Sequence, residues 1–158
     1  MIGTTNRSII VTISNQTGDS TVDESRLRSA VRHVLESNAI HTAIVGVAVL
    51  SDESIRRLNR DFLQHDNATD VLSFPLTMDR ETLEGDIAIS LDTATARAKD
   101  YDWEVADELL LYVIHGALHL VGYRDKSESS IAEMRAQEVA MLAHFGLRPR
   151  YHDPVISS

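Results

Sequence analysis

The most apolar segment of the chain, residues 109–121, also carries two histidines, and it constrains the fold more than any other feature. Its apolar side chains recur at helical spacing, which predicts a helix. Because so few of its positions are polar, we expect this helix to lie at the centre of the core. His115 and His119 are four residues apart, so their side chains lie on one face, about 40° apart and about 6 Å along the axis. The segment therefore predicts a central helix that presents two imidazoles to one place.

Two imidazoles in this arrangement can bind one zinc ion. Gly122 follows and predicts a left-handed end to the helix, after which the chain turns back. Asp125, three residues later, can then reach the same metal. The HxxxHxxGxxD pattern therefore predicts three metal ligands, His115, His119 and Asp125, with an open fourth position. That arrangement is typical of a catalytic zinc site rather than a structural one.

Simpler interpretations of the same residues stay open. A histidine on an apolar helix is commonly a core residue with a hydrogen-bond partner. Asp125 could equally be an exposed turn carboxylate paired with Arg124 or Lys126. Zinc proteases with two helix histidines carry a glutamate directly after the first histidine as general base. Here that position is Gly116, so a protease of this design would lack its proton shuttle.

The composition fits a single globular domain with a real core. The chain has 158 residues, of which 43% are hydrophobic, and we expect one domain over residues 1–149 and a loose tail at 150–158. Cysteine is absent, which excludes disulfides and thiolate metal sites. No signal-peptide pattern is visible, and the longest apolar stretch is too short to cross a bilayer. A cytoplasmic protein without a membrane partner is therefore expected.

The charge balance is acidic, with a formal net charge of −9 at pH 7. This argues against broad, charge-driven binding of nucleic acid. Local basic strips are still possible, although a solvated helix face explains most such groups equally well. The candidates form two groups, Arg56, Arg57 and Arg60, and Arg80, Arg97 and Lys99.

The order of elements predicts an α+β domain. Strand patterns occur at residues 9–13, 43–50, 71–75 and 86–90, and helix patterns at 21–37, 51–63, 91–101, 104–121 and 127–145. We expect Pro75 to end the third strand and residues 79–85 to connect it to the fourth. The result is a small mixed sheet of about four strands packed with about five helices, in which the apolar histidine helix is central.

Three separate motifs resemble the YbeY family, bacterial zinc-dependent endoribonucleases linked to ribosomal RNA maturation. The motifs are His115-Gly116-x-Leu118-His119-Leu120-x-Gly122-Tyr123, Thr69-Asp70-Val71-Leu72-Ser73-Phe74-Pro75 and Gly85-Asp86-Ile87-Ala88-Ile89, and an upstream Leu58-Asn59 also fits. The resemblance implies an endoribonuclease directed at single-stranded RNA, with one zinc ion per chain. It implies a role in maturing the 3′ end of 16S ribosomal RNA and in ribosome quality control. Its expected partners are RNA and the small ribosomal subunit or a basic ribosomal protein.

The chain departs from the family pattern at the third metal ligand. The resemblance implies a third histidine just beyond the Gly-Tyr pair, but this sequence reads Gly122-Tyr123-Arg124-Asp125. Zinc accepts an aspartate oxygen, so the site can survive the change. A carboxylate adds negative charge, which should weaken the metal as a Lewis acid and widen the choice of metal toward manganese or iron.

A second departure concerns an arginine that the family commonly carries six residues before the Thr-Asp pair, where this chain has Leu63. A guanidinium near the metal would hold a phosphate and stabilise developing charge. Arg60, one helical turn earlier, or Arg124, beside the metal loop, could substitute. The loop after Leu63 also offers an acid–base pair, His65 and Asp66, although surface polar residues are the commoner interpretation.

The resemblance implies that a metal on the three ligands polarises a phosphoryl oxygen, activates a water, or both. Arg60, Arg124 and Ser73 are the candidate catalytic residues. Ser73, on the third strand, is a possible hydrogen-bonding group for the nucleic-acid backbone, although a core strand explains it equally well. Glu108, two turns before His115, either accepts an imidazole N–H or is an ordinary polar residue.

Two other functions stay open at this point. A chain without the usual arginine and third histidine could be a ribosome-assembly factor that cuts little or nothing. Its acidic charge would suit docking on a basic ribosomal protein better than gripping RNA. It could also be a metal-dependent hydrolase of a small substrate.

Overall fold

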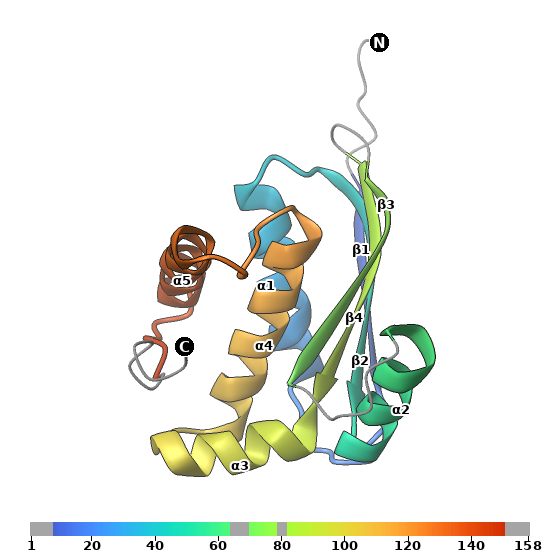
Figure 1. The fold of residues 1–158 in the computed structure, drawn as a ribbon, viewed down its shortest axis with the longest axis vertical. Helices are drawn as coiled ribbons and strands as arrows, with labels where there is room; N and C mark the ends of the chain where they lie inside the picture. The colour runs from blue at the N-terminus through green and yellow to red at the C-terminus, as the bar shows by residue number, and fades with distance from the viewer. Residues whose placement is uncertain (1–7, 64–69, 79–81, 151–158) are drawn as a thin grey trace, which may run out of the picture.

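The computed structural model describes residues 8–63, 70–78 and 82–150, which form four strands and five helices (Figure 1). In chain order these are β1 (Ile9–Asn15), α1 (Glu24–Ser37), β2 (Thr42–Leu50), α2 (Asp52–Leu63), β3 (Val71–Met78), β4 (Thr82–Ser90), α3 (Leu91–Tyr101), α4 (Val105–Leu120) and α5 (Glu128–Ala143). The predicted element order and the α+β class are confirmed.

The strands form one mixed sheet in the order β1-β2-β4-β3. β1 and β4 both pair parallel to β2, whereas β3 pairs antiparallel to β4. Parallel neighbours need a long crossover connection, and α1 provides the one from β1 to β2. The prediction of a small mixed sheet is therefore confirmed, and β3 lies at one of its edges.

Two strand boundaries differ from the prediction by three residues or more. β3 does not stop at Pro75 but continues to Met78, with a register shift between Pro75 and Thr77. Because β3 is an edge strand, a proline without an N–H is tolerated there. β4 begins at Thr82, so most of the expected connection at 79–85 belongs to the strand. Gly85 lies within it, where an added Cβ would come within 2.8 Å of Leu120 on α4.

Local capping sets the helix starts within a few residues of the expected positions. α1 begins at Glu24 because the side chain of Asp23 accepts the amide of Arg26. α5 begins at Glu128, after a capping box between Ser127 and Ser130. Of the predicted tail, Arg150 donates to the carbonyl oxygen of Asp102 at 2.7 Å, and residues 151–158 lie outside the described part.

The helices divide unequally between the two faces of the sheet (Figure 1). α1 and α4 cover one face, with α5 packed outside α4, whereas α2 covers part of the opposite face. A small apolar cluster lies under α2, and the main core lies on the α4 side. Among the described residues, no helix is long and apolar enough to cross a lipid bilayer.

α4 is the central element of the main core. Eleven of its sixteen residues are buried, and it contacts α1, α3, α5, β3 and β4. A helix that is apolar on nearly every side needs such neighbours all around. The prediction of a central apolar helix that carries the two histidines is therefore confirmed.

α1 also protects the outer edge of β1. Arg28 Nε donates to the carbonyl oxygen of Val11 at 3.1 Å, and Arg32 Nη2 donates to that of Ile9 at 2.8 Å. Both carbonyl groups belong to a strand that has β2 as its one neighbour in the sheet. The two arginines therefore satisfy backbone acceptors that the sheet itself leaves open.

Candidate metal centre

The two histidines of α4 face the same place, as the four-residue spacing predicts. The rings of His115 and His119 are 4.6 Å apart between centroids and meet edge to face at 77°. Each side chain is about one quarter exposed, on a helix that is otherwise buried. Both imidazoles therefore combine a fixed backbone position with access to solvent.

Gly122 ends α4 and returns the chain toward the histidines. Its φ is +111°, a conformation that favours glycine. The amide of Tyr123 donates to Leu118 O, and that of Gly122 to His119 O, both at 3.0 Å. These two bonds form a Schellman motif, which confirms the predicted glycine cap. Asp125 then lies beside the histidines rather than beyond the helix end.

Three side-chain atoms form a nearly equilateral triangle at this point. Nε2 of His119 is 3.1 Å from Nε2 of His115 and 3.2 Å from Oδ2 of Asp125. Nε2 of His115 is 3.3 Å from the same oxygen. Ligands bonded at about 2.0–2.1 Å to a tetrahedral zinc are roughly 3.3–3.4 Å apart, so the triangle fits one such ion. His115, His119 and Asp125 therefore form a group that could hold a metal ion, as predicted.

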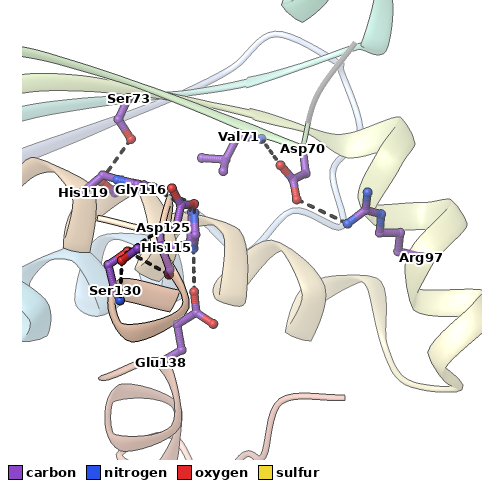
Figure 2. Close-up of polar contacts among 11 residues, drawn as sticks. Asp70, Val71, Ser73, Arg97, His115, Gly116, His119, Asp125, Ser130 and Glu138 are labelled. Atoms are coloured by element: carbon purple, nitrogen blue, oxygen red, sulfur yellow. Dashed lines mark hydrogen bonds and ion pairs between the residues drawn. The ribbon is translucent and has the colours of Figure 1, made fainter. Parts of the chain in front are cut away.

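Glu138 of α5 supports this group and was not predicted from the sequence. Its Oε2 lies 2.5 Å from Nδ1 of His115, the ring nitrogen that faces away from the triangle (Figure 2). Its side chain is 5% exposed. Carboxylates that hold the second nitrogen of a ligating histidine fix the ring orientation and the tautomer. Glu108, the residue considered for this role, instead accepts a hydrogen bond from Trp103 Nε1 at 2.8 Å.

The neighbouring carboxyl groups keep the imidazole of His115 in its protonated, cationic form when no metal is present. Burial alone lowers the pKa of His115, but hydrogen bonds to Asp125 and Glu138 raise this pKa to about 9. Burial and the nearby charge of His115 lower the pKa of His119. The hydrogen bond with His115 lowers the pKa of Asp125 to about 2. The metal-free group therefore pairs a cationic His115 with the carboxylate of Asp125 at neutral pH.

Close contact with the sheet positions the helix beside β3. A Cβ added at Gly116 would lie 2.7 Å from Cγ2 of Ile87 and 3.2 Å from Cγ2 of Val71. The glycine therefore lets α4 approach β3 and β4 directly after His115. Ser73 Oγ donates to Gly116 O at 3.2 Å, as Figure 2 shows. The hydroxyl of this predicted catalytic residue thus contacts the backbone of the histidine helix.

Of the other two predicted catalytic residues, the structure places Arg60 away from the metal group and Arg124 directly before Asp125 in the chain. Arg60 lies on α2, over the opposite face of the sheet, where its Nε is 3.6 Å from Asp61. Arg124 lies in the loop after α4 that carries Asp125, and its side chain is exposed. Leu63 is the last residue of α2. The proposed acid–base pair, His65 and Asp66, lies outside the described residues, as does Arg80.

A cavity of about 600 Å³ opens beside the metal group. It extends from His115 and Asp125 between the start of β3 and helices α3, α4 and α5. Arg97 of α3 lines it, 3.4 Å from Oδ2 of Asp70. The triangle of ligand atoms therefore lies at the side of a space that is large enough for part of a polymeric substrate.

Comparison with known proteins identifies the family. The sequence model of the family described as "Endoribonuclease YbeY" matches residues 12–146. The chain belongs to the YbeY family. A Moorella thermoacetica relative of that name is 37% identical over 152 residues, covering 86% of this chain and 97% of the relative. One from Salinibacter ruber is 34% identical over 125 residues, covering 74% and 80%.

A third YbeY relative, from Rhodopirellula baltica, is 42% identical over 105 residues; that match covers 65% of this chain and 54% of the relative. The fold also has a solved counterpart. The solution structure of a Thermotoga maritima protein superposes with a TM-score of 0.57 at 27% identity and covers 93% of this chain and 98% of its own. The family match over residues 12–146 covers both helix histidines and the loop with Asp125.

Proposed function

We propose that this YbeY family member is a zinc-dependent endoribonuclease that hydrolyses phosphodiesters of single-stranded RNA at His115, His119 and Asp125. The observation that carries the proposal is the convergence of three ligand atoms, 3.1 to 3.3 Å apart, beside an open cavity. The names of the matching relatives support the class of reaction. Two histidines and one carboxylate are a ligand set found in catalytic zinc enzymes.

A zinc ion on this group would supply a Lewis acid that polarises a phosphoryl oxygen and acidifies a water. His115 and His119 would bind it through Nε2, and Asp125 through a carboxylate oxygen. Glu138, bonded to Nδ1 of His115, would keep that ring turned toward the metal. With Asp125 as the third ligand, the ion would be a weaker Lewis acid than with a third histidine, because the carboxylate adds negative charge. A carboxylate ligand would also suit manganese or iron.

We further infer that the substrate is ribosomal RNA, with maturation of the 3′ end of 16S RNA and ribosome quality control as the roles. Such a substrate would place the protein in the cytoplasm. The formal net charge of −9 favours docking through a basic protein of the small ribosomal subunit over docking on RNA alone. The family assignment supports this inference, and the charge supports the kind of partner.

Metal content, followed by RNA cleavage, tests the proposal. Elemental analysis should find about one zinc per chain in the wild type and a loss of metal in His119→Ala and Asp125→Ala. The zinc-loaded wild type should cleave single-stranded ribosomal RNA, and both variants should be inactive. Lys126→Ala, in the same loop but outside the ligand triangle, is the matched control and should keep both properties.

Each result separates the candidate functions. Zinc without RNA cleavage would refute the nuclease and favour a hydrolase of a small substrate. Ribosome association that survives loss of zinc in His119→Ala, with no cleavage by the wild type, would favour a catalytically weak assembly factor. Zinc kept in Asp125→Ala would remove Asp125 from the ligand set.

A further inference from the structure

The lining of the cavity beside the metal group has more acidic than basic side chains. Apart from His115 of the metal group, its charged lining residues, between the start of β3 and α5, are Asp70, Arg97, Asp100, Glu108, Asp125, Arg135 and Glu138. Five of these seven residues are acidic. An RNA strand carries a negative charge on every phosphate, so this lining repels it wherever no cation faces the strand.

Arg97 is the more exposed of the two arginines that line the cavity. Its side chain is 48% exposed, whereas Nε and Nη1 of Arg135 are buried. Nη1 of Arg97 lies 3.4 Å from Oδ2 of Asp70. A guanidinium carries five N–H donors in one plane, so this ion pair leaves donors that can bind phosphate oxygens.

Asp70 holds this guanidinium in a fixed place relative to β3. One oxygen of Asp70 accepts the amide of Val71 at 2.8 Å, and the other pairs with Arg97. Val71 in turn packs beside Gly116, the residue that follows His115. Arg97 is therefore connected to the metal group through a short chain of packed residues on β3 and α4.

Arg97 and the metal group occupy different parts of the same cavity. In Figure 2, Arg97 lies beyond Asp70 as seen from His115. Both residues line the one cavity. A strand whose scissile phosphate lies at the metal group can therefore place another phosphate at Arg97.

We propose that Arg97 is a second phosphate-binding site, which holds a neighbouring phosphate of the RNA strand while the metal group acts on the scissile one. Asp70 is the positioning residue for this site. The inference rests on the proposed endoribonuclease function and extends it to the way the substrate strand is held. Arg97 binds substrate and takes no part in bond breaking, so its loss should weaken binding and leave the chemical step unchanged.

Kinetics and binding of the zinc-loaded protein test this site. Arg97→Ala should raise the KM for single-stranded RNA about tenfold, the weakening expected for one charge-assisted hydrogen bond, with kcat unchanged. A fluorescein-labelled single-stranded DNA of the same sequence, checked to be intact afterwards, measures binding directly. Loss of one phosphate contact should reduce the slope of log affinity against log salt by about 0.7.

Two further variants control for a merely structural effect. Lys99→Ala removes a cation from the same helix, at an exposed position that does not line the cavity. It should leave KM and the salt slope as in the wild type. Arg97→Lys keeps the charge without the planar fork, so it should restore the salt slope and recover part of the affinity.

The outcomes distinguish this inference from the function on which it rests. If the wild type cleaves RNA and Arg97→Ala matches it in KM and salt slope, the second phosphate site is refuted and the nuclease stands. If the wild type cleaves no RNA, the nuclease fails, and the DNA-binding comparison still decides the role of Arg97. Equal losses in Arg97→Ala and Lys99→Ala would show general charge attraction and overturn the site.

Discussion

Metal uptake by this protein should release one proton, and the proton should come from His115. The pKa of His115 is about 9 in the metal-free protein because of Asp125 and Glu138, despite burial, which lowers it. At pH 7.5 the protonated form then exceeds the neutral form roughly 30-fold, because the pH is about 1.5 units below this pKa. His119 has a lowered pKa and Asp125 a pKa of about 2, so neither carries a proton to release.

Metal and proton compete for His115, and this competition sets how metal affinity changes with pH. A raised pKa means that the folded protein holds the proton more tightly, so metal binding is weaker at low pH. Displacing the proton at pH 7.5 costs about 2 kcal/mol, and metal affinity should rise up to about tenfold per pH unit until pH 9. Above pH 9 the affinity should level off, because His115 is then already neutral.

Isothermal titration calorimetry in two buffers of different ionisation enthalpy measures the number of protons released. The wild type should release close to one per zinc ion at pH 7.5. Glu138→Gln keeps the size of the side chain but removes its charge, so the pKa of His115 should fall and fewer protons should be released. A wild-type count near zero, or an unchanged count in Glu138→Gln, would refute the reasoning.

Two further predictions concern stability. Gly116→Ala should lower the melting temperature by roughly 2–12 °C, because its Cβ would lie 2.7 Å from Ile87 and overpacking typically costs about 1–3 kcal/mol. Thermal unfolding measures this shift. An unchanged melting temperature would contradict the prediction and show that α4 moves away from the sheet without cost. The metal-free protein should lose stability as the pH rises toward and through 9. The raised pKa of His115 contributes stability that is fully present below pH 6.5 and is lost as the imidazole loses its proton. Chemical denaturation at several pH values measures the free energy of unfolding, and His115→Gln should flatten its dependence on pH.

The parts of the site that depend on local spacing could be predicted from the sequence. The four-residue interval sets His115 and His119 on one face, and Gly122 turns the chain so that Asp125 reaches them. These relations lie within one helix and its cap, so the geometry of a single turn decides them. The order of strands and helices could also be predicted, because apolar residues recur at a different spacing in strands and in helices.

The parts that depend on packing could not be predicted in the same way. Glu138 lies 23 positions after His115, and its contact requires α5 to dock on α4. Nothing in the local sequence distinguishes it from Glu108, which lies closer along the chain but faces Trp103. Pro75 could be placed inside a strand only once β3 was known to be an edge. The ion pair of Asp70 and Arg97 likewise joins the residue before β3 to α3 across 27 positions.

The arginines at the outer edge of β1 have a consequence for the behaviour of many copies of this chain together. An exposed edge strand offers backbone groups to any other strand and invites sheet-to-sheet aggregation. Arg28 and Arg32 occupy the acceptors of Val11 and Ile9 there. At the other edge, Pro75 and the adjacent register shift interrupt β3. Both edges of the sheet therefore carry features that disfavour pairing with a further strand, and these features should reduce polymerisation through the sheet when many copies are present.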